Sequence, residues 1–370
     1  MIDTHPPRHD QHGTVTRQIR HPQTSALPGF GHTTIQSLAM KSLAFFLPQT
    51  FFLLPALVSS TYTLDKDWPR GMPEEATYFS AIAVTDTGEV HISVRMNATS
   101  PILVFTPEGD YLEGWGGGDI SQTNEGVWGA HGLAFQEDGQ GKWEGEGPRI
   151  WVADIQAHTA LVFSSSPKPH TLTGTAGTPN KEGSGTTPYL QFGSTADVAT
   201  GTGEDYAGSV WVTDGDGGIN DRVVRLDTSQ GDTSIGAHPD WLAGNGAEGG
   251  ATTATFNSPH SIAFLENAGL LAVADRDDNR LVFLDAGTGG TVAILGGECL
   301  GSPVTTGRTA PWGVRIVPGG VGGRGGGDRL AVAVCDRPES GKNQRVVIID
   351  VDGLGGGCTV VETVEVDPAE

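Results

Sequence analysis

Two histidines at equivalent places in a repeated pattern are the first candidates for chemistry. His131 begins the stretch His131-Gly-Leu-Ala-Phe, and His260 begins the similar stretch His260-Ser-Ile-Ala-Phe. Imidazole is a ligand that suits zinc, and equivalent positions of a repeat can bring two imidazoles to one ion. The other interpretation is that each histidine simply lines a channel, which is the usual role of a single such residue.

Three charged residues could act beside such an ion. Arg95 ends a predicted strand, Arg276 directly follows a strand that ends in Val-Ala-Asp, and Asp216 follows the strand that ends at Asp214. A guanidinium offers a fixed fork of donors that can hold a carboxylate. In a chain with 44 acidic residues, however, the default role of an arginine is a salt bridge. Asp216 could accept a proton if burial raised its pKa.

Short strands in a repeated unit must position these side chains. From residue 80 onward, β-branched and aromatic segments alternate with Gly, Asp and Asn turns, and five copies of a four-stranded unit begin near residues 81, 131, 196, 260 and 312. In most copies the second strand ends in Asp, and an Arg follows after a turn. Such a repeat predicts an all-β fold, a β-propeller with five recognisable blades. A β-sandwich is the alternative, but it gives no reason for the repeat.

Composition excludes several classes of protein. The 55 glycines among 370 residues argue against a helical bundle, since glycine weakens helices. The 37% of hydrophobic residues, with 8 Trp and 13 Phe, are enough for a core and argue against general disorder. The net charge of −22 (22 basic minus 44 acidic residues) disfavours binding to nucleic acid or to anionic membranes. A small neutral or cationic partner fits better.

The N-terminal 60 residues differ from the rest of the chain. Residues 1–39 are rich in histidine and proline and lack apolar periodicity, which predicts a disordered leader. Residues 40–60 have a positive start, an apolar run and a small-residue end, which is the form of a secretory signal peptide. A membrane span is the alternative, but the run is short and contains two prolines. Met40 is therefore a candidate translation start. We expect the protein to be secreted and residues 61–370 to form the propeller.

Two further features bear on export. Asn97-Ala98-Thr99 is a sequon for N-glycosylation, so the sequence predicts a glycoprotein. The three cysteines are Cys299, Cys335 and Cys358, an odd number that allows one disulfide at most. Cys335 and Cys358 are the pair that we expect among the possible ones.

The strand-Asp-turn-Arg-strand unit resembles the NHL repeat. Two stretches narrow the resemblance: 256–264 (Phe-Asn-Ser-Pro-His-Ser-Ile-Ala-Phe) with 273–276 (Val-Ala-Asp-Arg), and 128–133 (Trp-Gly-Ala-His-Gly-Leu) with 151–155 (Trp-Val-Ala-Asp-Ile). Together with Asp67-Trp-Pro, they are similar to the lyase domain of peptidylglycine α-amidating monooxygenase, over roughly residues 65–365. That family, peptidyl-α-hydroxyglycine α-amidating lyase, is a six-bladed propeller.

The resemblance implies a carbon–nitrogen lyase that converts a peptide ending in α-hydroxyglycine into a peptide amide and glyoxylate. In the family, three histidines from different blades hold a central zinc, which polarises the substrate hydroxyl, and a tyrosine acts as base. His131 and His260 match two zinc-ligand positions, and Arg95 and Arg276 match two active-site arginines. The family's structural calcium, held by backbone carbonyls, would lie at residues that include Ile82 and Leu133.

The sequence departs from the family at two places. No third histidine matches. If the copy that begins at Trp312 corresponds to the family's last blade, Trp312 replaces the third ligand. If it corresponds to the fifth blade, which is the better match, the sixth blade with its histidine would follow Glu370. The family's Asp-Gly-Tyr is here Asp214-Gly-Asp216, which leaves Asp216 as the candidate base. A monooxygenase partner would supply the substrate. The alternatives are a non-catalytic extracellular propeller that binds a peptide or protein, and a calcium-dependent lactonase or esterase propeller.

Overall fold

The computed structural model describes residues 67–366, apart from gaps at 75, 97, 138–146, 167, 184–189, 218–219, 229, 245–254, 301–308, 318–328, 337–343 and 352–357. The chain divides into two units, Met1–Leu57 and Val58–Glu370, and every described residue belongs to the second. The predicted leader, the predicted signal peptide and Asn97 lie outside the described residues and stay predictions. Along the described residues, no helix is long and apolar enough to cross a membrane.

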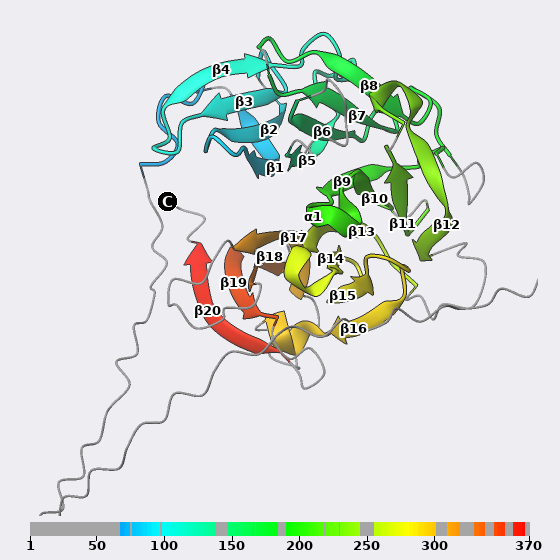
Figure 1. The fold of residues 1–370 in the computed structure, drawn as a ribbon. Helices are drawn as coiled ribbons and strands as arrows, with labels where there is room; N and C mark the ends of the chain where they lie inside the picture. Colours follow the sequence, from blue (N-terminus) through cyan, green and yellow to red (C-terminus); the bar gives the residue numbers. More distant parts are fainter. Residues whose placement is uncertain are drawn as a thin grey trace, which may run out of the picture. The chain divides into compact units, whose positions relative to one another are not determined.

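The described strands form five antiparallel four-stranded sheets, which confirms the predicted propeller blades (Figure 1). In each blade the strands pair in sequence order, and the first strand is the inner one. The strands of blades 1, 2 and 3 are β1 (Thr77–Val84), β2 (Val90–Met96), β3 (Ile102–Phe105), β4 (Tyr111–Trp115); β5 (Ala130–Gln136), β6 (Arg149–Asp154), β7 (Thr159–Ser164), β8 (Leu172–Ala176); and β9 (Thr195–Thr200), β10 (Ser209–Asp214), β11 (Arg222–Asp227), β12 (Gly236–Gly244).

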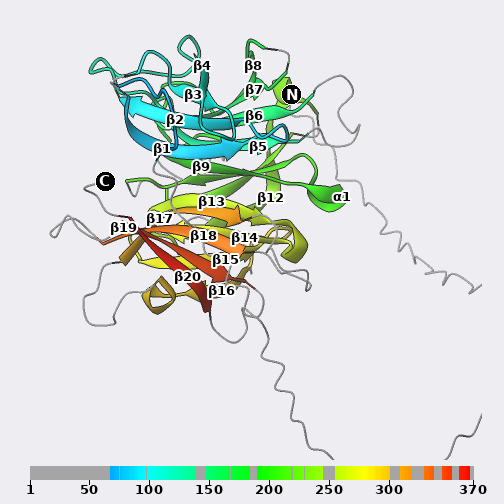
Figure 2. The same cartoon turned by 90° about the vertical axis from the view of Figure 1, so that its left-hand side faces the viewer.

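Blades 4 and 5 continue the same order, and the helical elements are single turns between strands. Figure 2 shows the molecule from the side, with the inner strand of blade 3 between those of blades 2 and 4. The remaining strands are β13 (Pro259–Leu265), β14 (Leu270–Asp275), β15 (Arg280–Asp285), β16 (Thr291–Leu295); and β17 (Thr309–Val317), β18 (Arg329–Asp336), β19 (Gln344–Asp350), β20 (Thr359–Val366). The turns are α1 (Gly203–Tyr206), η1 (Asp232–Ser234), η2 (Glu266–Ala268) and η3 (Gly297–Leu300).

The repeated aspartate has a structural role. Asp154, Asp214 and Asp275 end the second strands of blades 2, 3 and 4 and are fully buried. Each accepts hydrogen bonds from backbone N–H groups of the loop that precedes its own inner strand. The Nε atoms of Arg222 and Arg280 donate to Asp214 and Asp275 at 2.9 and 2.7 Å. Because burial of a carboxylate requires such partners, the Asp-turn-Arg pattern recurs wherever a blade must fix this loop.

All five inner strands carry a β-bulge at the same place. One residue in each falls outside the pairing register with the second strand: Ser80, His131, Ala196, His260 and Trp312. A bulge re-aims the side chain of the extra residue. These five residues line one cavity of ≈ 610 Å³, so the bulges turn equivalent repeat positions toward a shared axial space.

Buried apolar side chains form a separate core between each pair of consecutive blades from 1 to 5. These cores contain Leu133 (blades 1 and 2), Trp151 (blades 2 and 3), Trp211 (blades 3 and 4) and Leu330 (blades 4 and 5). In the described part of the chain, blades 5 and 1 share no such core. The face of blade 1 that points away from blade 2 is instead covered by side chains that include Trp68, from the segment before β1. We call the junction between blades 5 and 1 the open side.

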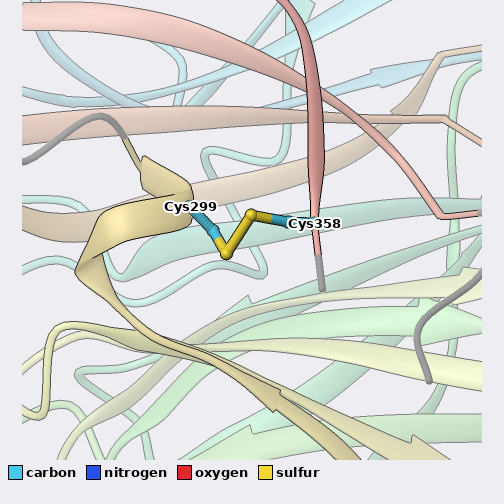
Figure 3. Close-up of a disulfide and its surroundings, with 2 residues drawn as sticks. All are labelled: Cys299 and Cys358. Carbon is cyan, nitrogen blue, oxygen red and sulfur yellow. A yellow bond between two sulfur atoms is a disulfide. The ribbon is translucent and has the colours of Figure 1, made fainter. Parts of the chain in front are cut away.

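The disulfide joins Cys299 in η3 to Cys358 before β20, with a Cα–Cα distance of 5.8 Å (Figure 3). The predicted pair of Cys335 and Cys358 is therefore wrong. Cys335 pairs with Gln344, at the end of blade 5 opposite to Cys358, because consecutive strands of the blade run antiparallel. Closeness in sequence misled the prediction, and strand direction gives the correct pair.

Candidate metal centre

His131, His260 and Asp216 come together at the propeller axis. One ligand atom from each lies within 4.8 Å of the others, and Nε2 of His131 is 3.5 Å from Oδ2 of Asp216. The centroids of the two imidazole rings are 4.9 Å apart. The histidines come from the bulges of β5 and β13, and Asp216 comes from the turn after β10. Three blades thus contribute one ligand each.

Both imidazoles are held in the tautomer that a metal ligand needs. Nδ1 of His131 is 2.7 Å from the carbonyl oxygen of Ala196, and Nδ1 of His260 is 2.7 Å from that of Trp312. Because a carbonyl can only accept, both Nδ1 atoms carry the proton and donate it. Each Nε2 therefore presents a lone pair, as in metal-binding histidines whose other nitrogen is fixed by a carbonyl. Both carbonyls belong to the bulge residue of the next blade.

The electrostatics favour the unprotonated forms. Burial and the neighbouring His260 lower the pKa of His131 to about 4, and burial lowers the pKa of His260. Burial alone would raise the pKa of Asp216, but His260, His131 and Arg276 together bring it below its ordinary value. Near neutral pH the cluster is thus two neutral imidazoles and a carboxylate. These are the states in which such groups bind metal.

The two predicted arginines lie beside Asp216. Nη1 of Arg276 donates to Oδ1 of Asp216 at 2.7 Å, and its guanidinium lies 4.8 Å from the centroid of the Trp312 ring. Burial lowers the pKa of Arg95, and the charge of Asp216 raises it in part. Nε of Arg95 is buried and makes no hydrogen bond within the described residues. One arginine therefore orients Asp216, and the other keeps a donor for another group.

The two residues of the expected calcium site make other contacts. Leu133 is buried in the core between blades 1 and 2, and the carbonyl of Ile82 accepts a hydrogen bond from Nε of Arg315 at 3.3 Å. Arg315 also forms a two-pronged pair with Asp197, with Nη1–Oδ2 and Nη2–Oδ1 distances of 2.7 and 3.2 Å. Oγ of Ser261 donates to the same carboxylate at 2.7 Å. A guanidinium therefore supplies positive charge beside Ile82.

The sequence identified both histidines. It did not predict that Asp216 lies beside them as a third candidate ligand, or that Asp197 and Arg315 form an ion pair. Asp216 lies in a turn whose direction depends on its ion pair with Arg276, and no local pattern encodes that pair. Asp197 could have been found, because it follows Ala196, the residue aligned with both histidines in the repeat.

Comparisons with known proteins agree with the repeat and the fold. No protein-family profile matches the chain. Human NHL repeat-containing protein 3 is 33% identical over 234 residues, which is 62% of this chain and 58% of that protein. Mouse NHL repeat-containing protein 3 is 29% identical over 329 residues, 84% of this chain and 80% of that protein. These relatives and the five blades fit an NHL-repeat propeller.

Among solved structures, similar chains include a Lactobacillus plantarum protein, with 15% identity and a TM-score of 0.48 over 78% of this chain and 71% of that one. A chain of the nidogen/laminin complex has 13% identity and a TM-score of 0.48 over 78% of this chain and 80% of that one.

Proposed function

We propose that His131, His260 and Asp216 bind one zinc ion, and that the chain cleaves peptides ending in α-hydroxyglycine into a peptide amide and glyoxylate. The convergence of three ligand atoms within 4.8 Å, from three blades, carries this proposal. The reaction breaks the bond between the amide nitrogen and the hydroxyl-bearing carbon. The hydroxyl loses its proton as its oxygen becomes the aldehyde oxygen, and the nitrogen gains a proton, so no oxidant or reductant is needed.

The residues present fit zinc. Catalytic zinc sites use three protein ligands drawn from nitrogen, sulfur and oxygen donors and keep a fourth position open. Two imidazole nitrogens and one carboxylate form such a set, and the backbone carbonyls behind both rings orient them. When bound, the ion would supply a Lewis acid for the substrate hydroxyl. Iron or manganese also accepts two histidines and a carboxylate, so these metals are the competitors to test.

The surrounding side chains have separate roles in this proposal. Asp216, with a lowered pKa, acts as a metal ligand and not as the base that the sequence suggested. Arg276 fixes the direction of Asp216 through their 2.7 Å bond. Arg95 has an unbonded buried Nε within the described part of the chain and binds the carboxylate of the hydroxyglycine end. The second candidate function is a non-catalytic propeller that binds a peptide, favoured by the apolar cavity beside the histidines.

Secretion and a partner belong to the same proposal. A disulfide persists mainly in oxidising compartments, so the Cys299–Cys358 bond supports export. A peptide with a hydroxylated terminal glycine must come from an oxygen-inserting enzyme, so a monooxygenase in the same compartment would act immediately before this chain.

The test measures bound metal and glyoxylate together. We expect about one zinc per purified chain by elemental analysis, and glyoxylate release from a hydroxyglycine-ended peptide. His260→Ala should abolish both, because two ligands cannot hold zinc at the same affinity. His170→Ala is the matched control, since His170 is a half-buried histidine on blade 2 whose Nδ1 also bonds a carbonyl. Zinc without glyoxylate would leave the peptide-binding function. Iron or manganese in place of zinc would refute the zinc assignment, and a chain that binds none of the three metals would refute the metal centre.

A further inference from the structure

Trp312 occupies the β-bulge of β17, the position at which blades 2 and 4 carry His131 and His260. Its side chain lines the axial cavity together with both histidines. An indole cannot take the place of an imidazole as a metal ligand, because its nitrogen only donates a hydrogen bond and has no lone pair to offer. The role of Trp312 must therefore come from its contacts.

The backbone of Trp312 does what the backbone of Ala196 does. Nδ1 of His260 donates to the carbonyl oxygen of Trp312, and Nδ1 of His131 donates to that of Ala196, each at 2.7 Å. Because Ala196 carries only a methyl group, this bond does not need a large side chain. The indole ring of Trp312 therefore has a role separate from that of its carbonyl.

The ring of Trp312 lies against the guanidinium of Arg276, whose Cζ is 4.8 Å from the ring centroid. Arg276 follows β14 of blade 4 and reaches the turn after β10 of blade 3, where Nη1 donates to Oδ1 of Asp216 at 2.7 Å. Its Nε donates to Oδ1 of Asp277 at 3.2 Å. These two bonds act in the plane of the guanidinium, whereas an aromatic ring over its face limits movement out of that plane.

The same ring also lies near His260, with ring centroids 5.2 Å apart and an interplanar angle of 71°. The imidazole of His260 is already fixed by its bond to the carbonyl of Trp312 and by burial. Arg276 has a long side chain with several rotatable bonds, so its position depends more on each contact. Resting on the proposed zinc centre, we propose that Trp312 is a positioning residue: its ring holds Arg276, and Arg276 holds Asp216 in the direction that zinc binding requires.

The test measures the zinc affinity of the full chain by competition with a chelating dye. Trp312→Leu keeps the backbone carbonyl and an apolar side chain but removes the aromatic face, and it should weaken zinc binding by ~5-fold, the size expected for a partly buried cation–π contact. Trp312→Phe restores a ring and should limit the loss to ~2-fold, because phenylalanine attracts cations less than tryptophan does. Ile316→Ala is the matched control and should leave the affinity unchanged. Ile316 lies on the same strand, is 39% exposed against 40% for Trp312, and does not line the cavity.

A second background identifies the route by which the ring acts. Arg276→Met should weaken zinc binding by ~10-fold or more, because the carboxylate of Asp216 loses the group that orients it. In the Arg276→Met background, Trp312→Leu should have no further effect, since the ring then has no guanidinium to hold. Urea midpoints of the metal-free variants check that each one folds. If Trp312→Leu does not fold, Trp312→Phe in both backgrounds gives the same comparison.

The outcomes separate this inference from the proposed function, because zinc affinity is measured independently of glyoxylate release. A loss in Trp312→Leu that requires Arg276 would support the inference even if the chain released no glyoxylate. An unchanged affinity in Trp312→Leu, or an equal loss in both backgrounds, would overturn the inference and leave the metal centre standing. A wild-type chain that binds no zinc would overturn both the inference and the zinc assignment.

Discussion

The junction between blades 3 and 4 and the junction between blades 5 and 1 use the same strand types but bury very different surfaces. In the first, Trp211 and Phe264 stack with ring centroids 5.0 Å apart inside a closed core. In the second, the described residues that face each other include exposed apolar side chains such as Phe79. Among the described residues, the sheets of blades 5 and 1 thus form without an apolar core between them.

The two junctions contribute differently to the stability of the propeller. Packed junctions hold the inner strands in place and so fix the bulges that carry His131 and His260. Residues of the open side, such as Phe79 and Val346, line part of the axial cavity. Truncation at the first junction should therefore lower the free energy of unfolding much more than truncation at the second.

The largest expected effect is the contrast between two aromatic truncations. Trp211→Ala, in the core of blades 3 and 4, should lower the free energy of unfolding by about 3–5 kcal/mol, because it leaves a cavity that neighbours cannot fill. Phe79→Ala on the open side should change it by less than about 0.5 kcal/mol, because this side chain is already 50% exposed. Urea denaturation of both variants checks the contrast. A similar loss in both would mean that the open side is closed in solution.

The next effect concerns the ion pair that links blade 5 to the other blades across the axis. Arg315→Met should lower the free energy of unfolding by about 2 kcal/mol, because it leaves the buried carboxylate of Asp197 without its charged partner. Arg315 is 30% exposed, so the loss should be smaller than for a fully buried pair.

Two further variants sharpen this prediction. Arg70→Met is the control, since Arg70 is exposed on the segment before β1. In Arg315→Met with Asp197→Asn, the loss should be smaller than the sum of the single losses, because the two residues interact directly. Additive losses would show that Arg315 acts through its bond to Ile82 or Ser261 and not through the charge pair.

The sequence predicted the blades because each blade repeats its own local constraints. The buried aspartates such as Asp275, with Arg280 a few residues later, are local pairs, so pattern alone reveals them. The repeat pattern also aligned His131 with His260, because both residues occupy the same position of the repeat. It did not reveal the bulges, since Ser80, His131, Ala196, His260 and Trp312 share no side-chain property that marks a bulge.

Contacts between distant turns and strands were the parts that the sequence could not supply. Asp216 reaches the histidines because Arg276, 60 residues later, holds its other oxygen. Arg315 reaches Asp197 across 118 residues. Such pairs depend on how the blades are arranged around the axis, and no repeat encodes them, because each occurs in one pair of blades.

The last prediction concerns pH and belongs to the packed junction of blades 1 and 2. His91 of β2 is buried, its Nδ1 accepts a hydrogen bond from Nε1 of Trp115 at 3.3 Å, and its ring faces His170. Burial, followed by the charges of His170 and Lys168, lowers the pKa of His91 from 6.5 to about 3. Between these values the unfolded chain binds the proton and the folded chain does not. The stability from this group is therefore complete above pH 6.5 and is lost as pH falls toward 3.

His91→Gln isolates this contribution, because glutamine can accept the bond from Trp115 but does not titrate. Relative to this variant, the wild-type free energy of unfolding should fall by about 1.4 kcal/mol per pH unit between pH 6 and pH 4. Asp275, whose pKa is raised to about 6 by burial, acts in the opposite direction over part of this range, but it is common to both proteins and cancels in the difference. Urea midpoints at several pH values give the slope. If the difference in unfolding free energy between the two proteins does not change with pH, His91 is accessible to water in the folded chain and the junction of blades 1 and 2 is not closed around it.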